Sequence, residues 1–121
     1  MDPKIEKRFE NVSKSKTFNN IVNIFNLDKK AVLDIGCSHG EFLINFGNES
    51  MGITNKDHQV EYGKEKNLNI VFGDIESESC PINKRFDVIF ANNLLEHLYS
   101  PHNFLENIKK YLKQDGILIL G

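Results

Sequence analysis

The chain has 121 residues and a formal net charge of −2, and hydrophobic residues make up 40% of it. This length predicts one domain, and an apolar content that includes nine Phe excludes an intrinsically disordered chain. No apolar run approaches the roughly 20 residues that cross a bilayer. The N-terminus, MDPKIEKRFE, lacks the apolar stretch of a secretory signal. We therefore expect a cytoplasmic domain without a membrane span.

Cysteine and charge usage narrow the choice of partners. Cys37 and Cys80 form no CxxC pair, so we expect reduced thiols rather than a disulfide or a structural zinc site. The four histidines form no ligand pattern, so no metal is expected. Fifteen Lys and Arg are dispersed among seventeen Asp and Glu, without the basic stripe that is typical of nucleic-acid binders. The expected partner is therefore a small molecule and not a nucleic acid.

The N-terminal part of the chain predicts two helices. Apolar side chains recur at helical spacing over residues 5–12 and again over 18–25, with a polar break between the two stretches. Thr17 is the expected N-cap of the second helix. We therefore divide the chain into an N-terminal helical segment, residues 1–29, and a core, residues 30–121.

Short apolar runs alternate with helical stretches from residue 30 onward. The runs predict five strands, at 31–35, 50–53, 69–72, 87–91 and 117–120. The stretches predict helices at 40–46, at 56–66 and from Ser100 to about 112. Gly63 is expected to weaken the second of these helices, and Asp115-Gly116 to stop the third. Because strands alternate with helices and are continuously apolar, we predict an α/β fold with a Rossmann-like, doubly wound, mostly parallel sheet.

Ligands of such sheets bind at the carboxyl ends of the strands. The first of these ends, DIGCSHG (34–40), is a strand, a glycine turn and a predicted helix start. Gly36 and Gly40 allow a sharp turn and a close approach to a ligand. The glycine spacing is GxxxG, and Thr54 stands twenty residues after Asp34. Neither a dinucleotide fingerprint nor a P-loop therefore matches.

Four segments in order resemble the class I S-adenosylmethionine-dependent methyltransferase family, over about residues 30–121. They are VLDIGCSHGEF (32–42), VFGDIE (71–76), FDVIFANNLLEHL (86–98) and FLENIKKYLKQDGILIL (104–120). The last two are similar to the small-molecule branch of that family. The resemblance implies S-adenosylmethionine as the cofactor and methyl transfer to a small-molecule acceptor. The alternative is a catalytically inactive methyltransferase-like domain that binds the cofactor or a partner protein.

The resemblance assigns the first cofactor-binding residues to the glycine turn. Asp34 would accept hydrogen bonds from the ammonium of the methionine moiety, although it could also be a cap at the end of the strand. Gly36, Ser38 and Gly40 would shape the pocket. Ser38 replaces the middle glycine of the usual motif, which is tolerable if its backbone angles are ordinary.

The other strand ends would bind the rest of the cofactor. Asp74 would accept from the adenine amino group, or form only an Asx-type turn, and the Ile75 backbone would lie beside the ring. The Asn92 carbonyl would face the sulfonium. The family's ribose-binding acid is replaced by Thr54, and Asp57 is a candidate substitute.

Three further residues in or near these segments have side chains that can act as bases or nucleophiles. His97 is a candidate general base, or else a surface or packing residue. His39 lies in the cofactor loop, where contact through its backbone is expected rather than catalysis. Cys37 is expected to be a packing residue and not a nucleophile, because no paired base is evident.

The strand count bears on the length of the chain. The family fold has seven strands, whereas this chain supplies five and stops at the end of the fifth. The fifth strand would then present an apolar sheet edge, which proteins normally cover. We therefore expect either a core truncated after the fifth strand, incomplete at its C-terminus, or a homodimer that covers this edge.

Overall fold

The computed structural model describes residues 2–77, 80–92, 94 and 98–121. Helices α1 (Pro3–Lys14) and α2 (Lys16–Phe25) precede a five-stranded sheet. The remaining elements are β1 (Val32–Ile35), β2 (Met51–Thr54), α3 (Asp57–Glu65), β3 (Ile70–Phe72), β4 (Phe86–Ala91), α4 (Pro101–Ile108) and β5 (Leu112–Leu120). Every strand pair is parallel, and the order across the sheet is β3-β2-β1-β4-β5. The predicted Rossmann-like α/β sheet is confirmed.

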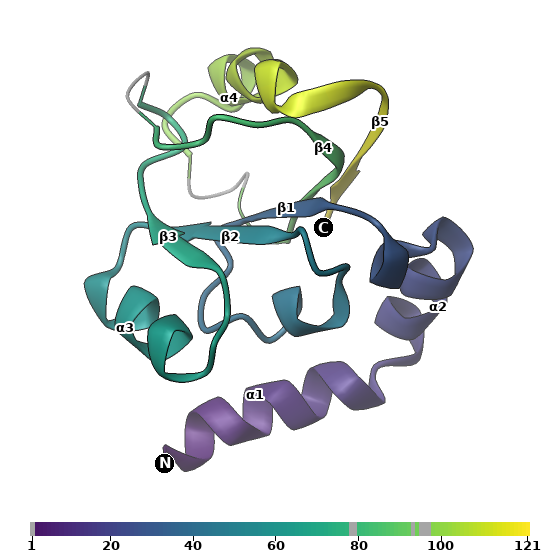
Figure 1. Cartoon of the computed structure of the whole chain (residues 1–121), viewed down its shortest axis with the longest axis vertical. Helices are drawn as coiled ribbons and strands as arrows, with labels where there is room; N and C mark the ends of the chain where they lie inside the picture. The colour runs from purple at the N-terminus through teal and green to yellow at the C-terminus, as the bar shows by residue number, and fades with distance from the viewer. Residues whose placement is uncertain (1, 78–79, 93, 95–97) are drawn as a thin grey trace.

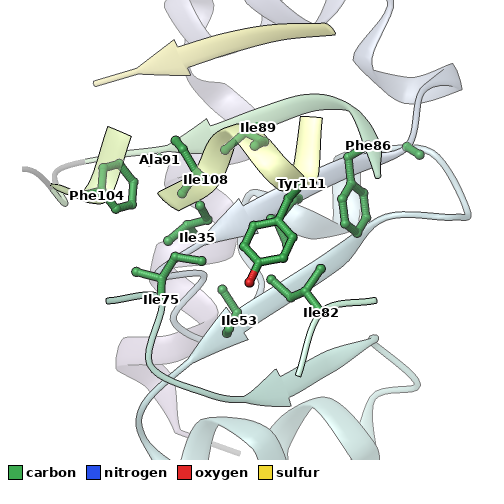
Figure 2. Close-up of a cluster of buried hydrophobic side chains, with 12 residues drawn as sticks. Ile35, Ile53, Ile75, Ile82, Phe86, Ile89, Ala91, Phe104, Ile108 and Tyr111 are labelled. Atoms are coloured by element: carbon green, nitrogen blue, oxygen red, sulfur yellow. The ribbon is translucent and has the colours of Figure 1, made fainter. Parts of the chain in front are cut away.

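The sheet is covered on both faces, which explains its continuously apolar strands. Figure 1 shows α4 on one side of the sheet, with α1 and α3 on the other. Neighbouring residues of β1 point to opposite faces, so Leu33 packs in the cluster beneath α4 and Val32 in the cluster beneath α1 and α2. Figure 2 shows Phe104, Ile108 and Tyr111 against the strand side chains of the first cluster.

The N-terminal helices pack onto the second face through aromatic rings. Phe18 of α2 lies 5.0 Å from Phe42 and 6.0 Å from Phe90, measured between ring centroids. The N-cap of α2 is Ser15 and not the predicted Thr17, because the Ser15 hydroxyl accepts from the Phe18 N–H at 3.2 Å. The division of the chain at residue 29 stays a prediction.

The helix predicted at 40–46 is wrong. That segment consists of turns and one short 3₁₀ helix, Leu43–Asn45. Gly40 has a φ of +89°, outside the helical region, and the Gly47 N–H donates back to the carbonyls of Leu27 and Lys30. Apolar residues recur at helical spacing here because Phe42 and Phe46 both reach the Phe18 ring, not because the chain is helical.

The fifth strand starts earlier than its sequence predicts. The Ser100 cap of α4 is confirmed by its bond from the Asn103 N–H, but the helix ends at Ile108 and β5 begins at Leu112. The register jumps between the pairs Phe86–Leu112 and Val88–Ile117, so the extra residues of β5 form a bulge. No helix in the described part of the chain has the length and apolar character needed to cross a membrane.

Candidate functional site

A cavity of about 490 Å³ lies at the carboxyl ends of β1, β2 and β3. Five of the predicted site residues line it: Gly36, Ser38, Thr54, Asp74 and Ile75. Asp34, Gly40 and Asn92 are not in its wall. The other lining residues are Ile35, Ile53, Asn55, Lys56, Gln59, Gly73, Glu76, Leu94 and Leu98. The structure therefore brings three strand ends together around one space, at the position where open α/β sheets bind ligands.

The glycine turn after β1 is held in left-handed backbone conformations. The φ angles are +71° at Gly36, +55° at Ser38 and +89° at Gly40. The Gly36 and Cys37 N–H groups donate to the carbonyl of Ile53 at 2.9 and 3.1 Å, which ties the turn to β2. Ser38 does not have the ordinary backbone angles that the sequence interpretation assumed. A left-handed conformation costs a non-glycine residue about 1–2 kcal/mol, so this turn is strained.

Asp34 is a buried carboxyl group without a full set of partners. The residue is 2% exposed, and its Oδ2 atom has no hydrogen-bond partner among the described residues. Burial, and then the charge of Glu41, raise the pKa of Asp34 well above its usual value. A strand-end cap would use its oxygens to accept from the backbone, so the unpartnered Oδ2 does not fit a cap, but Asp34 does not line the cavity either.

Glu41 is a second buried acid in the same turn, 8% exposed. Its Oε1 accepts from the His39 N–H at 3.1 Å. The sequence interpretation did not single out Glu41, although the residue directly follows Gly40 in the glycine motif. A charged residue between Gly40 and the apolar run at 42–44 is the signal that could have identified it.

Thr54 has a polar partner that sequence reasoning missed. The Thr54 hydroxyl donates to Gln59 Oε1 at 2.5 Å and accepts from the Lys56 N–H at 3.3 Å. Thr54 and Gln59 are both buried, and both line the cavity. Asp57, the suggested substitute for the missing acid, is exposed and does not line it. The signal for Gln59 was its spacing of four from Gly63, which places both residues on the buried face of α3.

The end of β3 combines two roles that the sequence left as alternatives. Asp74 Oδ1 accepts from the Glu76 N–H at 2.9 Å, so the Asx-type turn does form. Asp74 is also exposed and lines the cavity, next to the buried Ile75. The Gly73 N–H donates to the Thr54 carbonyl at 2.9 Å and thereby fixes this end beside β2. Asn92 follows β4 and lies against the last residue, outside the cavity wall.

The cysteine and histidine side chains near the cavity have packing roles. Cys37 is 2% exposed, and burial raises the pKa of its thiol, so it is a packing residue and not a thiolate nucleophile. The His39 ring lies 5.1 Å from the Tyr62 ring, and burial lowers the pKa of His39. His97 lies outside the described residues, and its role as a base stays a prediction. The described residues contain no group of three His, Cys, Asp or Glu that could hold a metal ion.

The fold and the cavity define the class of protein, a Rossmann-like α/β domain with a cavity at the ends of its first three strands. A family model described as "Methyltransferase domain" matches residues 6–120. The chain is 31% identical over 105 residues to a ubiquinone biosynthesis O-methyltransferase of Glaesserella parasuis, covering 76% of this chain and 44% of that protein. It is 31% identical over 105 residues to (S)-coclaurine N-methyltransferase of Papaver somniferum, covering 77% of this chain and 29% of that protein.

A solved structure has the same fold. The crystal structure of a coclaurine N-methyltransferase, bound to N-methylheliamine and S-adenosylhomocysteine, superposes with a TM-score of 0.66 at 21% identity, covering 88% of this chain and 37% of that one. The chain spans less than half the length of each of these relatives. It belongs to the methyltransferase domain family, and its fold is that of class I S-adenosylmethionine-dependent methyltransferases.

Proposed function

We propose that this chain is the cofactor-binding part of an S-adenosylmethionine-dependent methyltransferase that acts on a small-molecule acceptor. One observation carries the proposal: the cavity gathers the glycine turn, the Thr54–Gln59 pair and Asp74 from three adjacent strand ends. Its volume of about 490 Å³ falls within the range of small-molecule and cofactor sites. The chain's membership of the methyltransferase domain family supports the same cofactor.

The glycine turn suits the amino-acid end of the cofactor. Asp34 Oδ2 is a buried acceptor without a partner among the described residues, and a cationic ammonium is the group that satisfies such an oxygen best. Gly36 fits a close approach, because a Cβ atom there would lie 3.3 Å from Leu94 Cδ1 and narrow the cavity. The group that we infer to bind here is therefore the ammonium of the methionine moiety.

The ends of β2 and β3 suit the nucleoside end. Thr54 and Gln59 place a hydroxyl and an amide at the position where the family carries its ribose-binding acid. An amide offers both a donor and an acceptor to a pair of hydroxyl groups, so we propose that Gln59 replaces part of the function of that acid. Asp74 would accept from the adenine amino group, with Ile75 against the ring.

Methyl transfer requires chiefly that the protein aligns the acceptor with the methyl group of the cofactor. S-adenosylmethionine, when bound, supplies a methyl group that its sulfonium makes transferable. The residues of this chain hold the two ends of the cofactor, and Leu94 and Leu98 present apolar side chains to the cavity. Asn92 would contribute its carbonyl near the sulfonium, and His97 would accept a proton if the acceptor must lose one. Relatives named for O- and N-methylation of small molecules support an acceptor of this class.

We also propose the cell compartment in which the domain acts. Two free cysteines support a reducing compartment, the cytoplasm.

The edge of the sheet at β5 supports a homodimer. Within the described residues β5 pairs only with β4, and its Leu118 and Leu120 are 37% and 40% exposed. A homodimer would cover this edge of the sheet. A solution mass equal to that of one chain, with no aggregation, would contradict the dimer.

The proposal is tested by calorimetric titration with S-adenosylmethionine and S-adenosylhomocysteine. Asp34→Ala and Asp74→Ala should each weaken binding, whereas Asp28→Ala, an exposed site outside the cavity, should not. Absence of binding at millimolar ligand would refute the function, and equal affinities of both site variants and the unmodified protein would refute the site. Binding without transfer to a panel of phenols and amines would favour the alternative, an inactive cofactor-binding domain.

A further inference from the structure

Two hydrogen bonds fix the orientation of the Gln59 side-chain amide. The Lys56 N–H donates to the Thr54 hydroxyl oxygen at 3.3 Å, and the Thr54 hydroxyl donates to Gln59 Oε1 at 2.5 Å. If the amide were turned over, its nitrogen would donate to Thr54, and the hydroxyl proton would have no acceptor among the described residues. The amide oxygen therefore points to Thr54, and the amide nitrogen points away from it.

The amide nitrogen of Gln59 is left as a donor for a ligand. It has no hydrogen-bond partner in the described part of the chain. Gln59 is only 8% exposed, but its nitrogen is not sealed off, because Asp34 Oδ2 is the one fully buried side-chain polar atom there that lacks a partner. Since Gln59 lines the cavity, the accessible side of this nitrogen faces the cavity. The oxygen, in contrast, already accepts from Thr54.

The cavity wall between the end of β2 and Gln59 contains no carboxylate. Asn55 and Lys56 line it, whereas Asp57 does not. The Lys56 ammonium can only donate, and an Asn amide can donate or accept. The acids of the wall belong to the loop after β3. The part of the site where the family carries an acceptor therefore presents mainly donors in this chain.

We propose that Thr54 is a positioning residue that turns the Gln59 amide nitrogen toward the ligand, so that the ribose subsite donates hydrogen bonds where the family's acid would accept them. This inference rests on the proposed function. A carboxylate accepts only, so it selects free ribose hydroxyls that donate to it. An amide N–H2 group binds any ribose oxygen that accepts, in a hydroxyl or in an ether. The ligands of this subsite are therefore adenosyl compounds whose ribose is either free or O-alkylated.

Ribose analogues of S-adenosylhomocysteine test this polarity by calorimetric titration. The 2′-O-methyl and 3′-O-methyl ethers keep an acceptor oxygen and lose its proton, whereas the 2′-deoxy and 3′-deoxy compounds lose both. At one of the two positions the ether should bind the unmodified protein more tightly than the deoxy compound, by about three- to tenfold, the value of one hydrogen bond. This comparison needs only the unmodified protein.

Gln59→Glu should reverse the preference, because it puts an acceptor where the amide nitrogen was. The measured quantity is the ratio of the dissociation constants of the ether and of S-adenosylhomocysteine. The ratio should be at least about tenfold larger for Gln59→Glu than for the unmodified protein, since the ether has no proton to give to a carboxylate. Comparing the same ratio in two proteins cancels the steric cost of the methyl group. The titrations are made at pH 8, well above the usual pKa of a Glu side chain.

Two substitutions of Thr54 separate positioning from packing. Thr54→Val keeps the branched shape and removes the hydroxyl, so the Gln59 amide can turn its oxygen to the ligand. The ratio should then rise toward that of Gln59→Glu. Thr54→Ser keeps the hydroxyl and loses the methyl group, and its ratio should match that of the unmodified protein. A role in packing alone would move the ratio in Thr54→Ser and not in Thr54→Val.

The contrary results are distinct from failure of the proposed function. Equal ratios for the unmodified protein and Gln59→Glu would overturn the inference, because another acid of the wall would then accept from the ribose. Loss of binding of both ethers by the unmodified protein would also overturn it. An unchanged ratio in Thr54→Val would show that Thr54 does not position the amide. Absence of binding of S-adenosylhomocysteine itself would instead refute the proposed function.

Discussion

Replacing Asp34 by Asn should stabilise the fold while it weakens cofactor binding. Burial raises the pKa of Asp34 in the folded protein above the value of about 3.9 in the unfolded chain. Between these two values the folded state binds a proton that the unfolded state has released. The contribution of Asp34 to the free energy of unfolding therefore falls as pH rises from about 4 through the folded-state pKa. The amide of the Asp34→Asn variant would carry no such pH-dependent penalty.

The size of the effect follows from the unpartnered oxygen. Asn would also leave a polar atom unpartnered in place of Oδ2, but a buried charge costs more than the roughly 1–3 kcal/mol of a neutral unpartnered group, so the variant is spared that excess. Asp34→Asn should therefore raise the free energy of unfolding at pH 8 by at least about 1 kcal/mol, or the melting temperature by about 4 °C for a domain of this size. The difference between the two proteins should shrink as the pH falls below about 4, where Asp34 becomes protonated in the unfolded chain as well as in the folded protein.

Thermal unfolding of both proteins across this pH range measures the difference directly. Asp28→Asn changes an exposed carboxylate and serves as the control for net charge. A lower melting temperature of Asp34→Asn than of the unmodified protein at pH 8 would contradict the reasoning, because it would show that the carboxylate is satisfied by the folded protein. A stabilised variant that also loses affinity for S-adenosylhomocysteine would show that the acid is kept for function.

Three further substitutions test other parts of the structure. Gln59→Ala should weaken binding of S-adenosylhomocysteine about tenfold, which is the loss expected for one or two hydrogen bonds. Equal affinities of the variant and the unmodified protein by calorimetry would show that Gln59 does not bind the ribose. Gly63→Ala should lower the free energy of unfolding, measured by urea unfolding, by about 1–2 kcal/mol, because the added Cβ atom would lie 2.9 Å from Ile70 Cβ. A higher free energy of unfolding would instead show that helix propensity outweighs this overlap. Ser38→Gly should raise that free energy by up to about 1 kcal/mol, because relief of left-handed strain outweighs the added chain entropy; a loss would mean that the turn is unstrained.

The first four strands could be predicted from the sequence to within one residue at each end. Their apolar runs are continuous because the sheet is covered on both faces, and a short unbroken run of this kind is typical of a strand in a buried parallel sheet. The predicted helix at 56–66 is also confirmed, as α3. The weakening of this helix by Gly63 stays a prediction, and the structure adds that Gly63 is the contact where α3 meets Ile70.

The segment after the glycine turn could not be predicted from its apolar spacing. Seven residues are too few for periodicity to separate a helix from a turn whose rings meet a common partner, here Phe18. The start of β5 was missed for a related reason. Residues 112–116 are mostly polar, and their strand pairing depends on a bulge opposite β4 that only the assembled sheet specifies.

The candidate site was predictable where backbone motifs define it and not where side chains meet across elements. The glycine turn and Asp74 lie at strand ends that the sequence marks. Gln59 bonds to a partner that the fold brings close, the Thr54 hydroxyl, whereas Glu41 bonds to the His39 N–H within the turn itself. The left-handed angle of Ser38 has no sequence signal, because serine in this conformation is uncommon.

A crystal structure of the chain grown with S-adenosylhomocysteine tests the central claim most directly. We expect the ligand in the cavity at the ends of β1, β2 and β3, with its ammonium at Asp34, its ribose at Thr54 and Gln59, and its adenine between Asp74 and Ile75. A ligand bound elsewhere on the protein, or bound in this cavity in the opposite direction, would contradict the assignment of these residues.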